Sequence, residues 1–286
     1  MNVYSWNTLH MIHELNHVQN SPICLAWNFY DRSCLTSEKN RIKAIMLQIT
    51  GMLDSKKNTA LCLQEVSGDL LLELQLFEKD FDIYWYKHTR IPRLDHHLVN
   101  LIDNPYVLQG EYLVTLVSKA LGSKPHSFLQ YGQPGKAALV VEIPLSPQSK
   151  LSGGQLLINT HISIVANGKK QLRWLLECYA KENVKKIIVG DYNKTRKELV
   201  TDLFISPSFR EPETGLTTHM NGTCIDHILI DEATGSAEMK LCKITLVDQI
   251  QILSDLTTKK YVNHGAYNSM YADKISDHYP IRAIVT

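Results

Sequence analysis

The sequence predicts an α/β protein with a core of mixed β-sheet, and three observations support this fold class. Apolar side chains recur at helical spacing in one long segment: Ile42, Ile45, Met46, Ile49 and Leu53. Short apolar runs near both ends of the chain are typical of strands. Between residues 111 and 164, three more apolar runs are separated by Gly, Pro and Ser, as in antiparallel sheet. Helices mixed with sequential strands favour sheets with helices packed outside.

The first part of the chain predicts three strands and two helices. In order, they are Val3–Trp6, a helix from Glu38 to about Leu53, Thr59–Leu63, a helix starting at Ser67, and Phe81–Tyr86. Ser37 precedes the long helix and has a side chain suited to capping it. The alternation of strand and helix is the pattern expected when helices cover a sheet.

The second part is richer in strands. Apolar runs at about 111–118, 136–143 and 155–161 are followed by a helix around Lys170–Lys181 and strands at Lys186–Val189, Ile225–Ile230 and Ile281–Val285. No internal repeat and no linker rich in Pro, Gly or Ser divides the sequence. We therefore expect a single domain over residues 1–286.

The composition is that of an ordinary soluble protein, with 44% hydrophobic and 21% charged residues and a formal net charge of +1. A protein that coats nucleic acid non-specifically usually has a strong basic surplus, so any nucleic-acid site here is a local patch. No secretory signal and no apolar stretch long enough to span a bilayer are visible. The six scattered cysteines indicate reduced thiols. These features predict a cytoplasmic protein without a transmembrane segment.

Polar groups suited to metal binding or proton transfer follow or lie within successive apolar strands. They are Asn7, Glu65, His161, Asp191, Asn193, Asp226 and the adjacent pair Asp277-His278. The most informative stretches are "VGDYN" at 189–193 and "SDHYP" at 276–280. Any one of these residues, taken singly, is also explained as a turn or helix-cap residue. Strand ends at one edge of a sandwich converge, so together they predict metal-assisted phosphate chemistry.

These blocks resemble the endonuclease/exonuclease/phosphatase superfamily, the fold of deoxyribonuclease I, from the first strand to the last. The resemblance implies a four-layer α/β sandwich with two central mixed β-sheets and the site at one edge of the sheets. It also implies a metal-dependent phosphoric ester hydrolase in which water attacks the phosphorus in line. Mg²⁺ is the implied cofactor, with Mn²⁺ as a possible substitute.

The resemblance implies a role for each residue. Glu65, which closes "LCLQE", is expected to be the principal Mg²⁺ ligand. Asn7 would help to place that ion or a phosphate oxygen, and Asp277 stands where the family has a second carboxylate on the metal side. Asp191 and Asn193 would orient and deprotonate the attacking water.

Two histidines complete the expected site. His161 would donate to a non-bridging phosphate oxygen as negative charge builds. His278 would face the scissile phosphate, with Asp226 accepting its other ring N–H and fixing the tautomer.

The substrate class is less restricted by the sequence. The insert before Glu38, with "CLAWNFYDRSCL", is similar to the deadenylase, 2′-phosphodiesterase and Angel-like branch, which favours RNA or an oligonucleotide as substrate. A phosphatase of inositol lipids or of another small phosphorylated molecule, and a DNA endonuclease, remain alternatives. Aromatic and basic residues between 84 and 97 predict a substrate wall with Trp85, Lys87 and Arg90. The alternative is an edge strand leading into a solvated loop.

One competing motif points to another chemistry. "HELNH" at His13–His17 satisfies H-E-x-x-H, which on a helix presents two imidazoles to Zn²⁺. It makes a zinc metallopeptidase a minor alternative to the phosphate chemistry. The other interpretation is a non-catalytic surface cluster.

Overall fold

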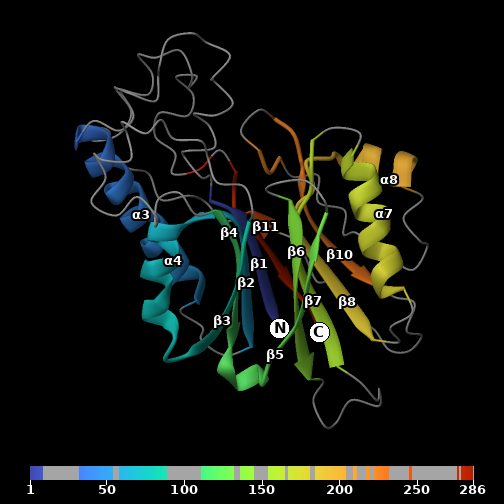
Figure 1. The fold of residues 1–286 in the computed structure, drawn as a ribbon, viewed down its shortest axis with the longest axis horizontal. Helices are drawn as coiled ribbons and strands as arrows, with labels where there is room; N and C mark the ends of the chain where they lie inside the picture. Colours follow the sequence, from blue (N-terminus) through green and yellow to red (C-terminus); the bar gives the residue numbers. More distant parts are fainter. Residues whose placement is uncertain are drawn as a thin grey trace.

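Two six-stranded β-sheets pack face to face, with helices on both outer sides (Figure 1). This is a computed structural model. It describes residues 1–8, 32–53, 58–88, 111–131, 136–144, 154–164, 167–180, 184–203, 209–210, 217–219, 222–231, 245–246, 276 and 278–285.

The first sheet has the order β11-β12-β1-β2-β4-β3. Its strands are β1 (Asn2–Asn7), β2 (Thr59–Ser67), β3 (Phe81–Lys87), β4 (Glu111–Ser118), β11 (Thr245–Leu246) and β12 (Ile281–Ile284). β1 and β2 are parallel, and every other neighbouring pair in this sheet is antiparallel. The outer face of this sheet is covered by helices α3 (Arg32–Leu53) and α4 (Gly68–Leu74), with the 3₁₀ turn η1 (Gln75–Phe77).

The second sheet has the order β5-β6-β7-β8-β10-β9. Its strands are β5 (Lys124–Gln130), β6 (Ala137–Pro144), β7 (Gly154–His161), β8 (Lys185–Asp191), β9 (Phe209–Arg210) and β10 (Asp226–Asp231). Here β7 and β8 form the parallel pair. Helices α7 (Asn167–Tyr179) and α8 (Arg196–Leu203) lie on the outer side of this sheet, and η2 (Lys119–Leu121) joins β4 to β5.

The apolar core has three layers that follow from the period-two alternation of the strands. Between the sheets, Cys62 and Val117 pack with Leu157 and Val189. A second layer joins the first sheet to α3 and α4, and a third joins the second sheet to α7 and α8. The order of layers is therefore helix, sheet, sheet, helix, which confirms the four-layer sandwich expected from the sequence.

Some element boundaries differ from the prediction. α3 begins at Arg32 rather than Glu38, so Ser37 lies within the helix and not at its N-terminus. The six residues 32–37 contain no Gly or Pro, and nothing local stops the helix there. Ser67 does cap α4, because its Oγ accepts a hydrogen bond from the Leu70 N–H at 3.2 Å. None of the described helices has the length and apolar character needed to cross a membrane.

Strand β5 was not predicted from the sequence. It lies at the edge of the second sheet and begins Lys124-Pro125-His126, all three exposed. An edge strand tolerates Pro and needs only one pairing partner, so it does not show the apolar signal of a central strand.

Candidate active site

The two parallel strand pairs bring polar groups from distant parts of the chain to one edge of the sandwich. β1 and β2 run in the same direction, as do β7 and β8, so the carboxyl ends of each pair lie at a common edge. β10 is antiparallel to β8 and starts opposite its end, with Asp226 paired to Asp191. β12 is antiparallel to β1, and His278 stands just before it. The residues that meet there are Asn7, Glu65, His161, Asp191, Asn193, Asp226 and His278.

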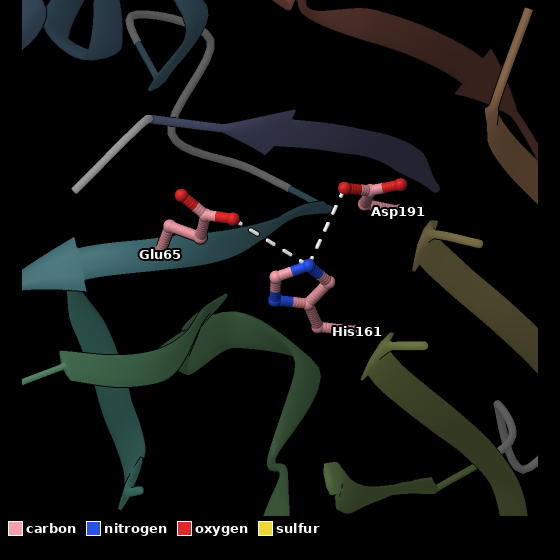
Figure 2. Close-up of side chains that lie close together, drawn as sticks. All are labelled: Glu65, His161 and Asp191. Carbon is pink, nitrogen blue, oxygen red and sulfur yellow. Dashed lines mark ion pairs between the residues drawn. The ribbon is translucent and has the colours of Figure 1, made fainter. Parts of the chain in front are cut away.

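The centre of this cluster is His161, which lies between two carboxylates (Figure 2). Its Nε2 is 3.5 Å from Glu65 Oε1 and 3.4 Å from Asp191 Oδ2. One ligand atom from each of the three residues lies within 4.8 Å of the other two. Glu65 comes from the first sheet, whereas His161 and Asp191 come from the second. The centre therefore exists only where the two sheets meet.

Asp191 is buried and is held by hydrogen bonds to both of its oxygens. Oδ1 accepts from the Asn193 backbone N–H at 2.8 Å. Oδ2 accepts from Asn193 Nδ2 at 3.2 Å and from Asn7 Nδ2 at 3.1 Å. The Asn193 amide also donates to the Ile162 carbonyl at 2.9 Å, which ties the loop after β8 to the end of β7. The carboxylate is thus fixed in one orientation.

Burial raises the pKa of Asp191 to about 6. His278 and Lys136 oppose this rise through their positive charge, whereas the nearby Asp226 carboxylate adds to it. A buried carboxylate with another carboxylate beside it favours protonation or a bound cation. The two carboxylates therefore supply negative charge that a divalent cation would neutralise.

His278 and Asp226 form a buried pair next to Asp191. Nδ1 of His278 is 2.8 Å from Asp226 Oδ2, and because an ionised carboxylate only accepts, Nδ1 carries the proton. Nε2 of the same ring is 3.9 Å from Asp191 Oδ2 and so faces the centre of the site. The backbone of His278 is fixed by Trp6 Nε1, which donates to its carbonyl at 3.0 Å, and by Ser276 Oγ, which accepts from its N–H at 3.1 Å.

A β-bulge turns Glu65 into the site. Leu61 and Leu63 of β2 face the helix layer, so strict alternation would place Glu65 there too. The register of β2 against β4 shifts between Leu63 and Val66, and Val66 occupies the helix-side position instead. Glu65 takes a φ of +53°, a left-handed backbone that costs a non-glycine residue about 1–2 kcal/mol. Glu65 thus carries backbone strain at the point where its carboxylate approaches His161.

Gly190, just before Asp191, is required by the close approach of β7 and β8. Its φ is +150°, and a Cβ added there would lie 1.8 Å from the Thr160 carbonyl oxygen. Only glycine fits this position without moving the backbone. The glycine of "VGDYN" therefore serves the packing that places Asp191 beside His161.

Several predicted site residues lie elsewhere. Asp277 and Arg90 are outside the described residues, as is the H-E-x-x-H motif at 13–17. Trp85 is 56% exposed on β3 and packs edge to face on Tyr112, at 5.8 Å between ring centroids. Lys87 Nζ lies 5.9 Å from the centroid of the same ring. Both belong to the outer face of the first sheet rather than to the Glu65 cluster, and their role in substrate binding stays a prediction.

Other residues of the site were missed. Lys136, just before β6, makes a hydrogen bond to His161 Nε2. It follows the same strand-end logic as the predicted residues, since it stands at the start of the apolar run 137–143. His219 packs edge to face on His278, with ring centroids 4.7 Å apart. Thr218 Oγ1 accepts from the N–H of Asp226 at 3.1 Å. Nothing local in the sequence marks these last two contacts.

Known proteins resemble this chain in structure. No family model and no curated protein sequence matches this chain. Solved structures do match. D. rerio TDP2 complexed with single strand DNA product aligns over 100% of this chain and 98% of that one, with a TM-score of 0.62 and 13% identity. The chain has the fold of the endonuclease/exonuclease/phosphatase superfamily.

Two further structures show how widely this fold is shared. The human Nocturnin catalytic domain with bound sulfate anion aligns over 100% of this chain and 94% of that one, with a TM-score of 0.57 and 15% identity. A Bacteroides thetaiotaomicron mannosyl-6-phosphatase aligns over 100% and 99%, with a TM-score of 0.57 and 13% identity. All three alignments span the whole of this chain, so the likeness concerns the complete sandwich.

Proposed function

We propose that this protein is a Mg²⁺-dependent phosphodiesterase that hydrolyses a phosphodiester bond in RNA or another oligonucleotide. The observation that carries the proposal is the meeting of Glu65, His161 and Asp191 from two sheets at one edge. The buried Asp226–His278 pair lies beside them. Carboxylates, an imidazole and a carboxylate-oriented histidine are the groups that metal-assisted hydrolysis of a phosphoric ester requires.

The donor set fits a hard divalent cation. Glu65 would be the principal ligand, joined by the amide oxygen of Asn7 and by Asp277. The Asn7 Nδ2 donates to Asp191, so this amide is already oriented at the edge of the site. When bound, the cation would supply positive charge to a phosphate oxygen and to the leaving oxygen.

Asp191 is proposed as the general base. Its pKa of about 6 makes it a stronger base than an exposed aspartate, while leaving it ionised at neutral pH. Three hydrogen bonds from Asn7 and Asn193 fix its oxygens, so that a water molecule bound at Oδ2 would be held in one direction. The proton of that water would pass to Asp191 as its oxygen attacks phosphorus, while the bond between phosphorus and the leaving oxygen breaks and the leaving oxygen takes a proton from solvent.

The histidines and Lys136 are proposed to stabilise charge on the phosphate. Asp226 fixes the orientation of the His278 ring, so that Nε2 would face a phosphate oxygen. His161 Nε2 approaches Asp191 Oδ2, the oxygen that also accepts from Asn7 Nδ2, so it would reach the same phosphate. Lys136 adds a positive charge beside His161.

The oligonucleotide preference has its own support. Among the structures with this fold, TDP2 was solved with a single strand DNA product. In this chain, exposed Trp85 and Lys87 stand on β3. Lys87 pairs with Tyr112, and Tyr112 pairs with Val66, next to Glu65, so Trp85 and Lys87 lie on the outer face of the first sheet near the strand end that carries Glu65. Aromatic rings and cations so placed would hold flanking nucleotides.

A second candidate is a phosphatase of an inositol lipid or another small phosphorylated molecule. The net charge of +1 favours it, because a small ester needs no extended basic surface. The mannosyl-6-phosphatase with the same fold supports the same reading.

The test offers the purified protein five substrates in Mg²⁺: labelled poly(A), 2′–5′ oligoadenylate, an abasic duplex, plasmid DNA and a phosphoinositide panel. We expect shortening of an RNA substrate without nicking of the plasmid, and loss of turnover in EDTA. Phosphate release from inositides alone would establish the second candidate. Nicking of plasmid DNA would establish a DNA endonuclease.

Asp191→Asn is the matched variant for this assay. It keeps the size and the hydrogen-bonding shape of the side chain while removing the proposed base, so kcat should fall by about 10²–10⁴. Its circular dichroism spectrum should match that of the wild type. A variant with near-normal kcat would exclude Asp191 from the chemistry.

A further inference from the structure

A pair of buried polar side chains joins the two sheets directly below the site. Gln64 precedes Glu65 on β2, and Asn159 lies two residues before His161 on β7. Both are 0% exposed, and Gln64 Nε2 donates to Asn159 Oδ1 at 2.8 Å. Their surroundings are the apolar layer between the sheets. Polar groups in such a layer are costly unless they are hydrogen-bonded, so a contact of this kind calls for an explanation.

Asn159 makes hydrogen bonds to both β2 and β4 where the pairing of these two strands is interrupted. Leu63 and Val114 are the last regular pair before the bulge. Asn159 Nδ2 donates to the Leu63 carbonyl at 3.1 Å and to the Val114 carbonyl at 2.9 Å. It also lies 3.2 Å from Thr115 Oγ1, so two N–H groups serve three acceptors on two strands. One side chain from the second sheet therefore holds both strands of the first sheet where their pairing is interrupted.

Gln64 completes the bridge from the bulge itself. Its Nε2 also approaches the Cys62 carbonyl at 3.3 Å and Ser5 Oγ at 3.4 Å. Ser5 belongs to β1, two residues before Asn7. The bridge thus links β1, β2 and β4 to β7, the strand that ends in His161. Each of these strands except β4 carries a residue of the site.

We propose that Asn159 and Gln64 are positioning residues that hold the strained Glu65 bulge against the His161 strand. The bridge sets the 3.5 Å separation of Glu65 Oε1 and His161 Nε2 and keeps Glu65 in its left-handed conformation. Neither side chain faces the reacting atoms, and both act through the backbone of their neighbours. The inference rests on the proposed function, because it concerns the same site.

The test measures Mn²⁺ binding by isothermal titration calorimetry. Asn159→Leu keeps the number and branching of the side-chain heavy atoms but removes the four hydrogen bonds that Asn159 makes in the bridge. We expect its Mn²⁺ affinity to fall by about tenfold or more, the range seen when groups that orient metal ligands are lost. Gln64→Met is measured in the same way, so the question stays answerable if Asn159→Leu does not fold.

Leu157→Ala is the matched control. Leu157 lies on β7 in the same layer between the sheets, two residues farther from the site than Asn159, and is equally buried. This variant should lower the melting temperature through a packing defect, yet leave Mn²⁺ affinity within about twofold of wild type. A general loss of stability would weaken binding in all variants in proportion to their melting temperatures, and that result would overturn the proposal.

A double-mutant cycle tests whether Asn159 and Gln64 affect Mn²⁺ binding together or independently. If the residues act as one unit, Gln64→Met combined with Asn159→Leu should bind Mn²⁺ no more weakly than the worse single variant. Additive losses, or unchanged affinity in folded single variants, would refute the inference. Wild-type protein that neither binds Mn²⁺ nor hydrolyses any substrate would refute the proposed function instead.

Discussion

Lys136 shows how one side chain changes the electrostatics of the whole site. Its Nζ makes a hydrogen bond to His161 Nε2, and its charge helps to lower the pKa of Asp191 against the effect of burial. Among the described residues, Lys136 thus adds positive charge beside the Glu65, Asp191 and Asp226 carboxylates. Lys136 therefore couples the proposed base to the groups that would contact the phosphate.

We expect Lys136→Met to lower kcat by about 10–100-fold with a smaller change in KM, because the charge acts mainly on the transition state. Lys136→Arg, which keeps the charge but changes its geometry, should recover part of the activity. Steady-state kinetics on the substrate identified above give both constants. Equal activity of the Met variant and the wild type would show that Lys136 only packs against His161.

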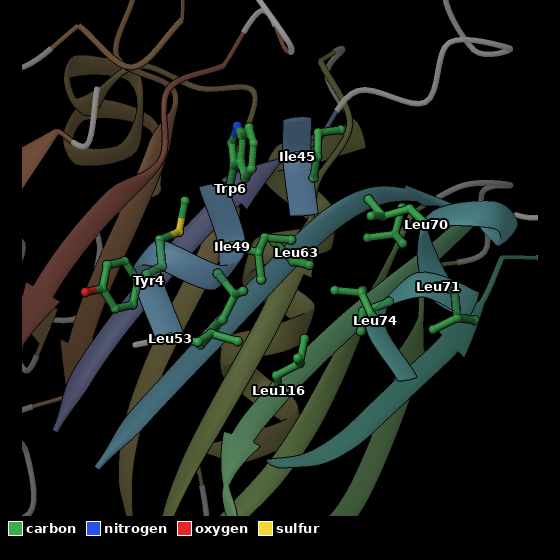
Figure 3. Close-up of a cluster of buried hydrophobic side chains, with 14 of the residues drawn as sticks. Tyr4, Trp6, Ile45, Ile49, Leu53, Leu63, Leu70, Leu71, Leu74 and Leu116 are labelled. Atoms are coloured by element: carbon green, nitrogen blue, oxygen red, sulfur yellow. The ribbon is translucent and has the colours of Figure 1, made fainter. Parts of the chain in front are cut away.

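At the scale of elements, the packing of helices on the first sheet is a direct consequence of helical spacing. Ile45, Ile49 and Leu53 of α3 face Trp6 and Leu63 of the sheet in one buried cluster, with Leu70 and Leu74 of α4 alongside (Figure 3). The spacing of these α3 residues was sufficient to predict the helix and its buried face. Trp6 of this layer also donates a hydrogen bond to the His278 carbonyl, so the packing of the layer helps to fix the position of His278 in the site.

Two glycines make opposite predictions. Gly190→Ala would place a Cβ 1.8 Å from the Thr160 carbonyl, so β7 and β8 could no longer pair as they do. We expect a loss of more than about 3 kcal/mol in the free energy of unfolding. Gly51→Ala is the control, because no atom lies within 4 Å of its added Cβ on helix α3. It should stabilise the protein by about 0.5–1 kcal/mol. Urea unfolding measures both, and similar values for the two would contradict the steric argument.

The start of α8 predicts a pH dependence. Thr195 N and Oγ1 both donate to Glu198 Oε2 at 2.7 Å, and the Glu198 N–H points back to Thr195 Oγ1 at 3.4 Å. The Thr195 backbone N–H, followed by its hydroxyl, lowers the pKa of Glu198 below its usual 4.5. A lowered carboxylate pKa adds stability above the unfolded pKa, and that stability is lost as pH falls through the folded pKa.

Thr195→Ala should therefore cost about 1 kcal/mol at pH 7. Glu198→Gln should be less stable than wild type at neutral pH, and the difference should shrink as pH falls below 4.5 and disappear once pH is below the lowered pKa of Glu198 in the folded state. Urea unfolding across this range checks both variants. A difference for Glu198→Gln that stays constant with pH would show that its charge is irrelevant to the cap.

The limits of the sequence are clearest at particular strands. β1, β7 and β8 could be predicted because each is rich in apolar residues and ends in a polar group. β5 could not, because an exposed edge strand has no such pattern. The bulge at Glu65 was also invisible, since it depends on the pairing of β2 with β4 and on Asn159 from the other sheet. Local sequence patterns thus predict the strands, whereas tertiary contacts determine the direction in which the side chains at the strand ends point.

For the whole molecule, the two ends of the chain close the site together. β1 pairs with β12, and the Val285 N–H donates to the Met1 carbonyl at 2.8 Å. This pairing places His278, near the end of the chain, beside Asn7, near its start, through the Ser276 Oγ bond to the Asn7 carbonyl at 2.7 Å. The sequence predicted which residues are polar at strand ends, but the closure depends on a pairing across nearly the full length of the chain.

A cation bound where the two sheets meet should stabilise the entire fold, because it binds only when both sheets are assembled. At about 100 times its Kd, Mn²⁺ adds about 2.7 kcal/mol of stability, which corresponds to a rise of about 5–10 °C in Tm for a chain of this size. Glu65→Ala should abolish this metal-dependent rise. Glu73→Ala, which removes an exposed carboxylate on α4, should leave it unchanged. Differential scanning calorimetry with EDTA and with Mn²⁺ measures each increment. An equal Mn²⁺ effect in Glu65→Ala would place the stabilising ion elsewhere and remove Glu65 as its principal ligand.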